Sequence, residues 1–98
     1  MNRIESALRK NKPAFIPYLM VGDPDLATTE TLVRALARNG AAAVELGIPY
    51  GDPLADGPTI AAAGQRALAN GTGVRDVLAL AQRVAGEIPV VLFNHCLL

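Results

Sequence analysis

The sequence predicts an α/β fold with a parallel sheet, and two observations support this. Short apolar runs typical of buried strands occur over residues 15–21, 42–46 and 88–93. Segments with helical spacing of apolar residues precede and separate them, in the order α-β-α-β-α-α-β. Either an open doubly wound sheet or a piece of a (β/α)8 barrel has this order. A Rossmann sheet is poorly supported, because no Gly-x-Gly-x-x-Gly motif follows the first run.

The first elements are bounded by residues that end helices and strands. A short helix is expected over residues 2–10. The first strand, residues 15–21, contains Pro17, which is tolerated only where a strand starts or bulges. The next helix is expected over residues 28–38, because Asn39 and the glycine after it are typical of a helix C-terminus. Its expected apolar stripe consists of Leu32, Val33 and Leu36.

The later elements carry similar signals. The second strand, residues 42–46, ends just after Glu45. A helix is expected over residues 58–69, because proline is favoured in the first helical turn. Another helix is expected over residues 74–84, and the third strand over residues 88–93. The expected apolar stripe of the last helix consists of Val74, Val77, Ala81 and Val84.

Composition and charge exclude several classes of protein. The 98 residues carry nine Lys or Arg and nine Asp or Glu, so the formal net charge of zero argues against a nucleic-acid binder. No apolar run is long enough to span a membrane, and the N-terminus has no apolar signal core, so a cytoplasmic protein is expected. His95 and the single cysteine, Cys96, are adjacent, so on a strand they would point to opposite faces. We therefore expect no disulfide, catalytic thiol or metal site.

The stretch from residue 44 to 59 holds three prolines, three glycines and three carboxylates. Glu45 is expected at the carboxyl end of a strand, where catalytic groups of parallel sheets gather, although a glutamate there can also simply reach water. Asp52 and Asp56 each precede a turn residue, and a structural role in turns or helix caps is the alternative to a chemical one. Tyr18, on the first strand, has a structural alternative as a core aromatic with its hydroxyl at the rim.

This stretch resembles the signature of the tryptophan synthase alpha chain family. The matching residues run from Glu45 to Tyr50 and from Asp52 to Ile60. A second block, Phe-Ile-Pro-Tyr at residues 15–18 followed by Gly-Asp-Pro at 22–24, resembles the first strand and loop of that family. The resemblance implies the N-terminal portion of a (β/α)8 TIM barrel. Residues 1–98 would form one partial-barrel domain with parallel strands one to three and flanking helices, and the barrel would be incomplete.

The resemblance also implies an activity and a partner. The family is a lyase of tryptophan biosynthesis that cleaves indole-3-glycerol phosphate to indole and glyceraldehyde 3-phosphate, with no cofactor expected. Glu45 matches the catalytic acid/base, and Asp56 matches the carboxylate that stabilises positive charge at the indole nitrogen. Tyr18 matches an aromatic position beside the indole ring. Asp52 and Pro53 match loop positions that contact the beta chain, with which the family forms a heterotetramer.

The chain departs from the family pattern in ways that affect activity. Gly51 stands where serine is usual, and His95 stands at an aromatic position that faces the active site. The phosphate site of the family uses loops late in the barrel, which have no counterpart in these 98 residues. The chain alone is therefore expected to be a very poor enzyme. The alternative is a non-catalytic truncated module that self-associates or pairs with complementary barrel fragments. Side chains expected to point into the barrel interior are those of Tyr18, Met20, Val44, Leu46, Val91 and Phe93.

Overall fold

Three parallel strands form one sheet, in the same order along the sheet as along the chain. The structure is a computed structural model, which describes residues 4, 14–49 and 58–93. The predicted parallel sheet and its alternation with helices are confirmed. The elements are β1 (Tyr18–Met20), α2 (Leu26–Arg38), β2 (Val44–Gly47), α3 (Pro58–Ala69), α4 (Val74–Val84) and β3 (Val90–Phe93).

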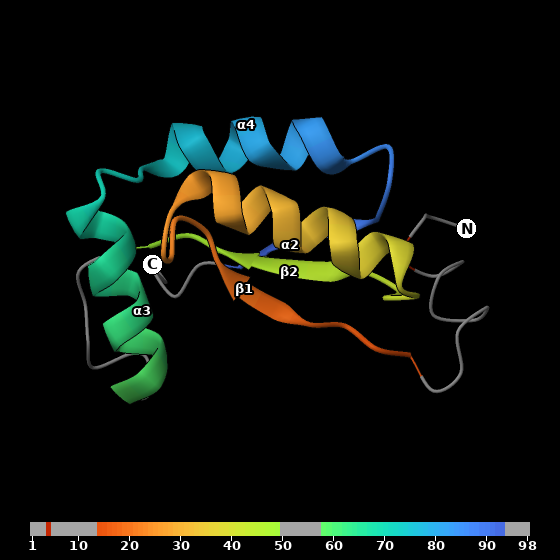
Figure 1. The fold of residues 1–98 in the computed structure, drawn as a ribbon, viewed down its shortest axis with the longest axis horizontal. Coiled ribbons are helices and arrows are strands. Elements are labelled where there is room, and N and C mark those ends of the chain that lie inside the picture. Colours follow the sequence, from red (N-terminus) through yellow and green to blue (C-terminus); the bar gives the residue numbers. More distant parts are fainter. Residues whose placement is uncertain (1–3, 5–13, 50–57, 94–98) are drawn as a thin grey trace.

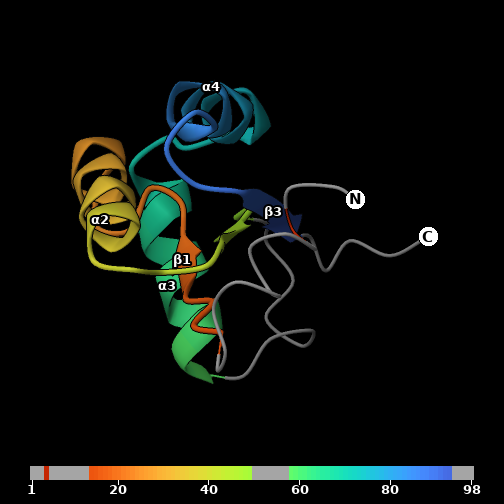
Figure 2. The same ribbon diagram turned by 90° about the vertical axis from the view of Figure 1, so that its right-hand side faces the viewer.

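The helices divide into two groups around the sheet. The two helices α2 and α4 lie beside each other on one face of the sheet (Figures 1 and 2). The third, α3, lies at the end of the sheet where β1 finishes, and it contacts that strand (Figure 1). Within the described ranges, no helix is long and apolar enough to cross a membrane.

The core lies between the sheet and the layer formed by α2 and α4. The buried members of this cluster are Val21, Val33, Val44, Leu46, Val77, Leu80, Val84 and Ile88. Two of them, Val44 and Leu46, were expected to point into a barrel interior, and that prediction is wrong. Both are fully buried on the helix-covered face, because successive side chains of a strand alternate between faces.

The opposite face of the sheet carries the residues that alternate with this core. In the parallel register, Glu45 is aligned with Tyr18 on one side and Val91 on the other. Two residues further on, Gly47 is aligned with Met20 and Phe93. We call this the inner face. The prediction is thus confirmed for Tyr18, Met20, Val91 and Phe93.

Helix α2 begins two residues earlier than predicted, because Asp25 caps its N-terminus. The Oδ1 atom of Asp25 accepts a hydrogen bond from the backbone N–H of Thr28 at 2.7 Å. The helix also buries Thr29 rather than Leu32, which is 41% exposed. A buried threonine is tolerated here because its hydroxyl donates to the Asp25 carbonyl at 2.9 Å and accepts from the Gly22 N–H at 3.1 Å.

The predicted bounds of α3 and α4 are confirmed, whereas the strands are shorter than predicted. In α4, Leu80 is fully buried, while Val74 in the first turn is 52% exposed, contrary to the expected stripe. The strands β1 and β3 each begin at the residue after a proline, Pro17 and Pro89. Each proline carbonyl accepts a hydrogen bond from β2, but a proline has no N–H to donate. Of the predicted helix over residues 2–10, only Ile4 is described, and it is helical.

Ion pairs join α2 to α4 along their outer rims. The Glu30 carboxylate accepts from Arg34 at 2.8 Å and from Arg83 at 2.9 Å, and Arg34 also pairs with Glu87. Hydrogen bonds from Arg34, then Arg83, hold the pKa of Glu30 below its usual value. These contacts are at the surface, so they orient the two helices more than they stabilise the fold.

We expect the isolated chain to self-associate or to remain partly unfolded. The outer edges of β1 and β3 are not paired by another strand within the described residues, and the helix-side Leu92 is 40% exposed. Leaving a large apolar side chain in water forfeits about 1.5–3 kcal/mol, and open edges favour pairing between chains. Sedimentation at several concentrations, combined with hydrogen exchange, measures this. A well-protected monomer at every concentration would contradict the expectation.

Candidate active site

Glu45 lies inside β2, not at its end as the sequence predicted. The strand continues for two residues because Leu46 and Gly47 pair with both neighbouring strands. The Glu45 side chain is half-buried on the inner face. Among the described residues, its carboxylate has no hydrogen-bond or ion-pair partner. A carboxylate in this position can exchange a proton with a ligand without first breaking an internal contact.

The ring of Tyr18 lies across the inner face above Gly47. An ideal Cβ atom built on Gly47 would stand 2.0 Å from the Tyr18 hydroxyl oxygen and 2.6 Å from Cζ. The same ring meets the ring of Phe93 edge-on, with centroids 6.1 Å apart and planes at 85°. Tyr18 therefore bridges all three strands, and glycine is needed at position 47 for reasons of space. The sequence reading had not singled out Gly47, although its place two residues after Glu45 puts it on the same face.

A second, smaller apolar cluster fixes α3 against β1. Met20 packs with Ala63 and Ala67, and Tyr18 and Ile60 border the cluster. Small alanines on α3 let the helix approach the strand closely. The first residues of α3 are thereby held near the carboxyl end of β1, on the side of the Tyr18 ring.

Polar contacts tether α3 to the loop after β1. The Arg66 guanidinium donates two hydrogen bonds to the Asp23 carboxylate, at 2.8 and 2.9 Å. The Asn70 amide donates to the carbonyls of Gly22 and Pro24. The hydrogen bond from Arg66 is the main reason that the pKa of Asp23 is lowered, against a smaller opposing effect of burial. Sequence reasoning missed this tether because its partners are more than forty residues apart.

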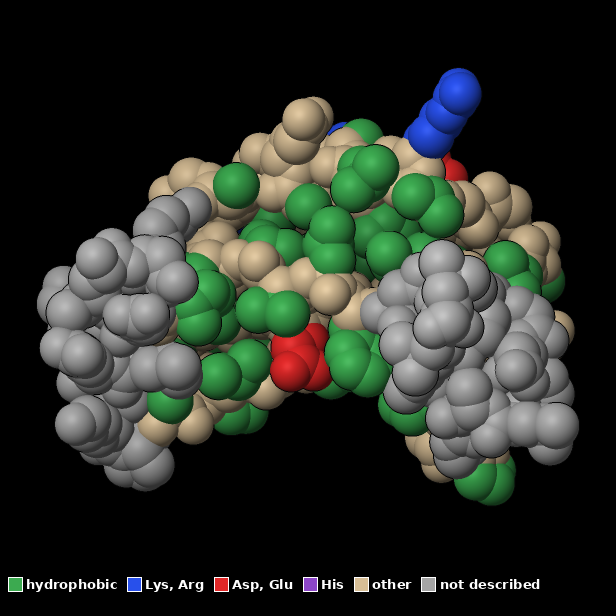
Figure 3. All heavy atoms as spheres, turned by 180° about the vertical axis from the view of Figure 1, so that it is seen from behind, with side chains coloured by type: hydrophobic (Ala, Val, Ile, Leu, Met, Phe, Trp, Pro, Cys, Tyr) green, Lys and Arg blue, Asp and Glu red, His purple; other side chains and the backbone are tan. Residues whose placement is uncertain are grey.

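The view from behind shows Asp or Glu atoms in red at the lower centre of the molecule (Figure 3). Hydrophobic side chains lie on both sides of this carboxylate and above it (Figure 3). In the part of the chain that the structure describes, no three His, Cys, Asp or Glu side chains gather closely enough to hold a metal ion. The site is therefore a carboxylate and an aromatic ring on a mainly apolar surface. Asp52, Pro53, Asp56, His95 and Cys96 lie outside the described residues.

Comparison with known proteins identifies the family. A family model described as tryptophan synthase alpha chain matches residues 4–97. The chain belongs to this family. Glu45, Tyr18 and the short strands around them thus lie within the matched region of a tryptophan synthase alpha chain.

Curated relatives match the chain along nearly all of its length. The tryptophan synthase alpha chain of Synechococcus elongatus is 54% identical over 94 residues, covering 93% of this chain and 35% of the relative. That of Gloeobacter violaceus is 50% identical over 96 residues, again covering 35% of the relative. The chain therefore spans about a third of the length of the relatives it matches.

Solved structures agree on the fold. The alpha subunit of tryptophan synthase from Legionella pneumophila superposes with a TM-score of 0.86 at 40% identity, covering 96% of this chain and 38% of that one. A tryptophan synthase complex from Pyrococcus furiosus gives a TM-score of 0.69 at 42% identity, covering 83% of this chain and 34% of that one. The three strands and their helices are thus part of a (β/α)8 TIM barrel, and the predicted barrel portion is confirmed.

Replacing Gly47 by Ala should lower the free energy of unfolding by about 1–3 kcal/mol, the usual cost of overpacking. The new methyl group would overlap the Tyr18 ring. Tyr18→Leu in the same chain should recover much of the loss. Gly86→Ala is the matched control, because its Cβ would meet no atom within 4 Å. Thermal and urea unfolding measure the free energy of unfolding of the wild type, the two single glycine variants and the double variant. An equal loss of stability in the Gly47 and Gly86 variants would show that Tyr18 does not restrict position 47.

The α3 tether should depend on pH in the acid range. Because the pKa of Asp23 is lowered from 3.8, the ion pair stabilises α3 above that pH and is lost as pH falls through the lowered value. Arg66→Gln should reduce the hydrogen-exchange protection of α3 amides at pH 6. The difference between wild type and variant should vanish near pH 2. A difference that persists unchanged at pH 2 would contradict this role for the pair.

Proposed function

We propose that this chain supplies the acid/base part of a lyase site that cleaves indole-3-glycerol phosphate to indole and glyceraldehyde 3-phosphate. The carrying observation is the half-buried carboxylate of Glu45, without a partner among the described residues, on the inner face beside Tyr18. Its occurrence in a chain of the tryptophan synthase alpha chain family supports the assignment. Activity belongs to a completed barrel, because the chain spans only about a third of its relatives.

The reaction needs protons to move at two places. Carbon 3 of the indole must gain a proton before indole can leave, and the glycerol hydroxyl that becomes the aldehyde must lose one. One carboxyl group that can both donate and accept a proton can serve these steps in turn. Glu45 is proposed for this role, because no described side chain competes for its carboxylate.

Two further residues complete the proposed site. Asp56 is proposed to stabilise the positive charge that protonation places on the indole nitrogen. It stands two residues before the first residue of α3, and Ile60 in the first turn of α3 packs against the cluster that borders Tyr18, which supports the proposal. Tyr18 is proposed to lie beside the indole ring, where an aromatic neighbour favours a flat apolar ligand.

The proposal also includes a partner protein and a cellular location. We propose the tryptophan synthase beta chain as partner, in a heterotetramer, with Asp52 and Pro53 at the contact. The similarity to a tryptophan synthase complex supports this. Residues 1–98 are proposed to act as one partial-barrel domain in the cytoplasm, without a cofactor.

The alternative is a non-catalytic module, and the partial coverage of the relatives favours it for the isolated chain. Remote binding energy from a phosphate group helps to hold the reacting carbon in place. An assay of indole release by the purified chain, with indole-3-glycerol phosphate as substrate, separates the two. Clear turnover by the chain alone would reject the module, and no turnover by a folded chain would favour it.

Glu45→Gln should abolish cleavage in a completed barrel while leaving substrate binding in place. The barrel for this test joins the chain to the rest of the Synechococcus elongatus alpha chain. Loss of general acid/base catalysis predicts a kcat lower by about 10²–10⁴-fold with little change in KM. Asp56→Asn should lower kcat by about 10²–10³-fold.

Glu30→Gln is the matched control, because Glu30 lies on the outer rim of α2 and pairs with Arg34 and Arg83. Its kcat should stay within about twofold of wild type. Normal turnover by the Glu45 variant in an active barrel would reject the role proposed for Glu45.

A further inference from the structure

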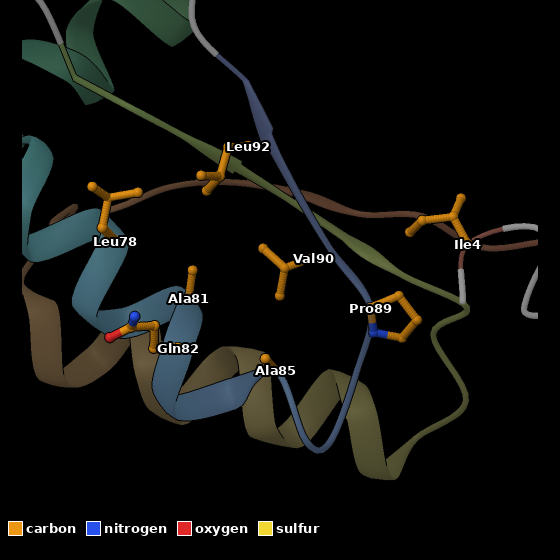
Figure 4. Close-up of a pocket in the computed structure, with 8 residues that line it drawn as sticks. All are labelled: Ile4, Leu78, Ala81, Gln82, Ala85, Pro89, Val90 and Leu92. Carbon is orange, nitrogen blue, oxygen red and sulfur yellow. The ribbon is translucent and has the colours of Figure 1, made fainter. Parts of the chain in front are cut away.

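Two Asn-Gly pairs in this chain directly follow helices. Asn39 and Gly40 come after the last residue of α2, and Asn70 and Gly71 come after the last residue of α3. The two helix ends lie at opposite ends of the molecule (Figure 1), and all four residues are exposed. Neither pair lines the apolar groove between α4 and β3 that Figure 4 shows. The two pairs are therefore matched in sequence and in exposure.

An Asn-Gly pair in water can lose ammonia through a reaction of its own backbone. The glycine amide nitrogen gives its proton to hydroxide and attacks Cγ of the asparagine side chain. A five-membered succinimide ring closes, and the side-chain nitrogen leaves as ammonia with a proton returned by water. Water then adds to one ring carbonyl and breaks its bond to nitrogen, which leaves aspartate or isoaspartate. Glycine favours the attack, because it has no side chain and a wide range of backbone angles.

The backbone turn is the same at the two helix ends. The Ala41 N–H donates to the Leu36 carbonyl at 3.1 Å. In the same way, the Thr72 N–H donates to the Ala67 carbonyl at 3.1 Å. The glycines of the two pairs adopt φ values of 93° and 79°, as is usual where a helix ends in such a turn. A difference in reactivity must therefore come from the remaining contacts.

The attacking nitrogen is held in one pair and not in the other. The Gly71 N–H donates to the Leu68 carbonyl at 2.9 Å. The Gly40 N–H has no acceptor among the described residues. A hydrogen-bonded N–H must give up its acceptor before the nitrogen can turn toward the asparagine side chain. This contact slows the reaction at the second pair only.

The asparagine side chains differ as well. The Asn70 amide donates to the carbonyls of Gly22, at 3.4 Å, and Pro24. Within the described ranges, these two carbonyls accept no other hydrogen bond. The Asn39 amide donates to the Ala35 carbonyl at 2.7 Å, which also accepts from the Asn39 backbone N–H at 3.1 Å. Loss of the amide thus leaves the carbonyl at α2 satisfied but removes the donor for both carbonyls beside α3.

We propose that Asn39 is a site of spontaneous deamidation in the folded protein, and that the contacts of Asn70 and Gly71 protect the second pair. The product at position 39 adds a negative charge at the end of α2 and removes a hydrogen bond that the backbone duplicates. At position 70 the product would place a carboxylate, which cannot donate, against two carbonyl oxygens of the loop after β1. The modification therefore falls where it disturbs fewer contacts. The proposal does not depend on the lyase chemistry.

Incubation of the purified chain in mildly alkaline buffer, followed by mass spectrometry of its peptides, measures both rates in one sample. We expect Asn39 to deamidate faster than Asn70 by about tenfold or more, because the hydrogen bonds of the second pair must break first. In urea that unfolds the chain, the two rates should become similar. Hydrogen exchange of α2 and α3 checks the fold, and where the chain lacks that protection the completed barrel takes its place. Equal rates in the folded protein overturn the proposal, and so does a difference that persists unchanged in urea.

The variants Asn39→Asp and Asn70→Asp mimic one product of each reaction and serve as matched controls for each other. Both place a negative charge at a helix C-terminus, so the unfavourable effect of the helix dipole is common to them. Asn70→Asp should speed the hydrogen exchange of α3 amides by about fivefold or more, because two carbonyls lose their donor. Asn39→Asp should change the exchange of α2 amides by no more than about twofold. An equal or larger effect of Asn39→Asp overturns the protective role of the Asn70 contacts.

Discussion

The alternation of side chains along β2 decides what each face of the sheet can do. Val44 and Leu46 fill the core beneath α2 and α4, so the residues between and after them, Glu45 and Gly47, must face the other way. A shift of register by one residue would place the Glu45 carboxylate in the core and expose Leu46. Burying an unpaired carboxylate is far more costly than exposing a leucine. The core packing therefore determines the orientation of the candidate acid.

The loop after β1, around Gly22, connects the sheet to the helices at the end of the sheet where the candidate site lies. Gly22 adopts a φ of 93°, and a Cβ atom there would stand 2.1 Å from the Thr72 hydroxyl oxygen. Its N–H donates to the buried Thr29 of α2. The loop after β1 is thus held by α2, by the segment before α4, and through Arg66 and Asn70 by α3. These distant contacts fix α3 and the loop after β1 relative to the strand that carries Tyr18.

Local signals in the sequence were enough to predict the helices and strands found between residues 14 and 93, but not the contacts between them. Proline at position 58 and Asn39 before a glycine gave correct helix ends, because caps and first turns depend on neighbouring residues. The burial of Thr29 in place of Leu32 could not be read from periodicity, since it depends on a hydrogen bond to Gly22, seven residues away. Alternation predicts only that Glu45 faces away from Val44 and Leu46, and the packing of these two residues under the helices decides which face that is. The Tyr18 ring above Gly47 likewise appears only when the strands are paired.

The position of Tyr18 above Gly47 has a consequence for how the family could diversify. Because residue 47 has no side chain, the surface above that point of β2 is made by a phenol ring from β1. One substitution at position 18 would change the shape of the surface over both β1 and β2. It would also remove the edge-on contact with the ring of Phe93. Positions 18 and 47 should therefore vary together among family members, with a smaller residue at 18 wherever 47 gains a side chain.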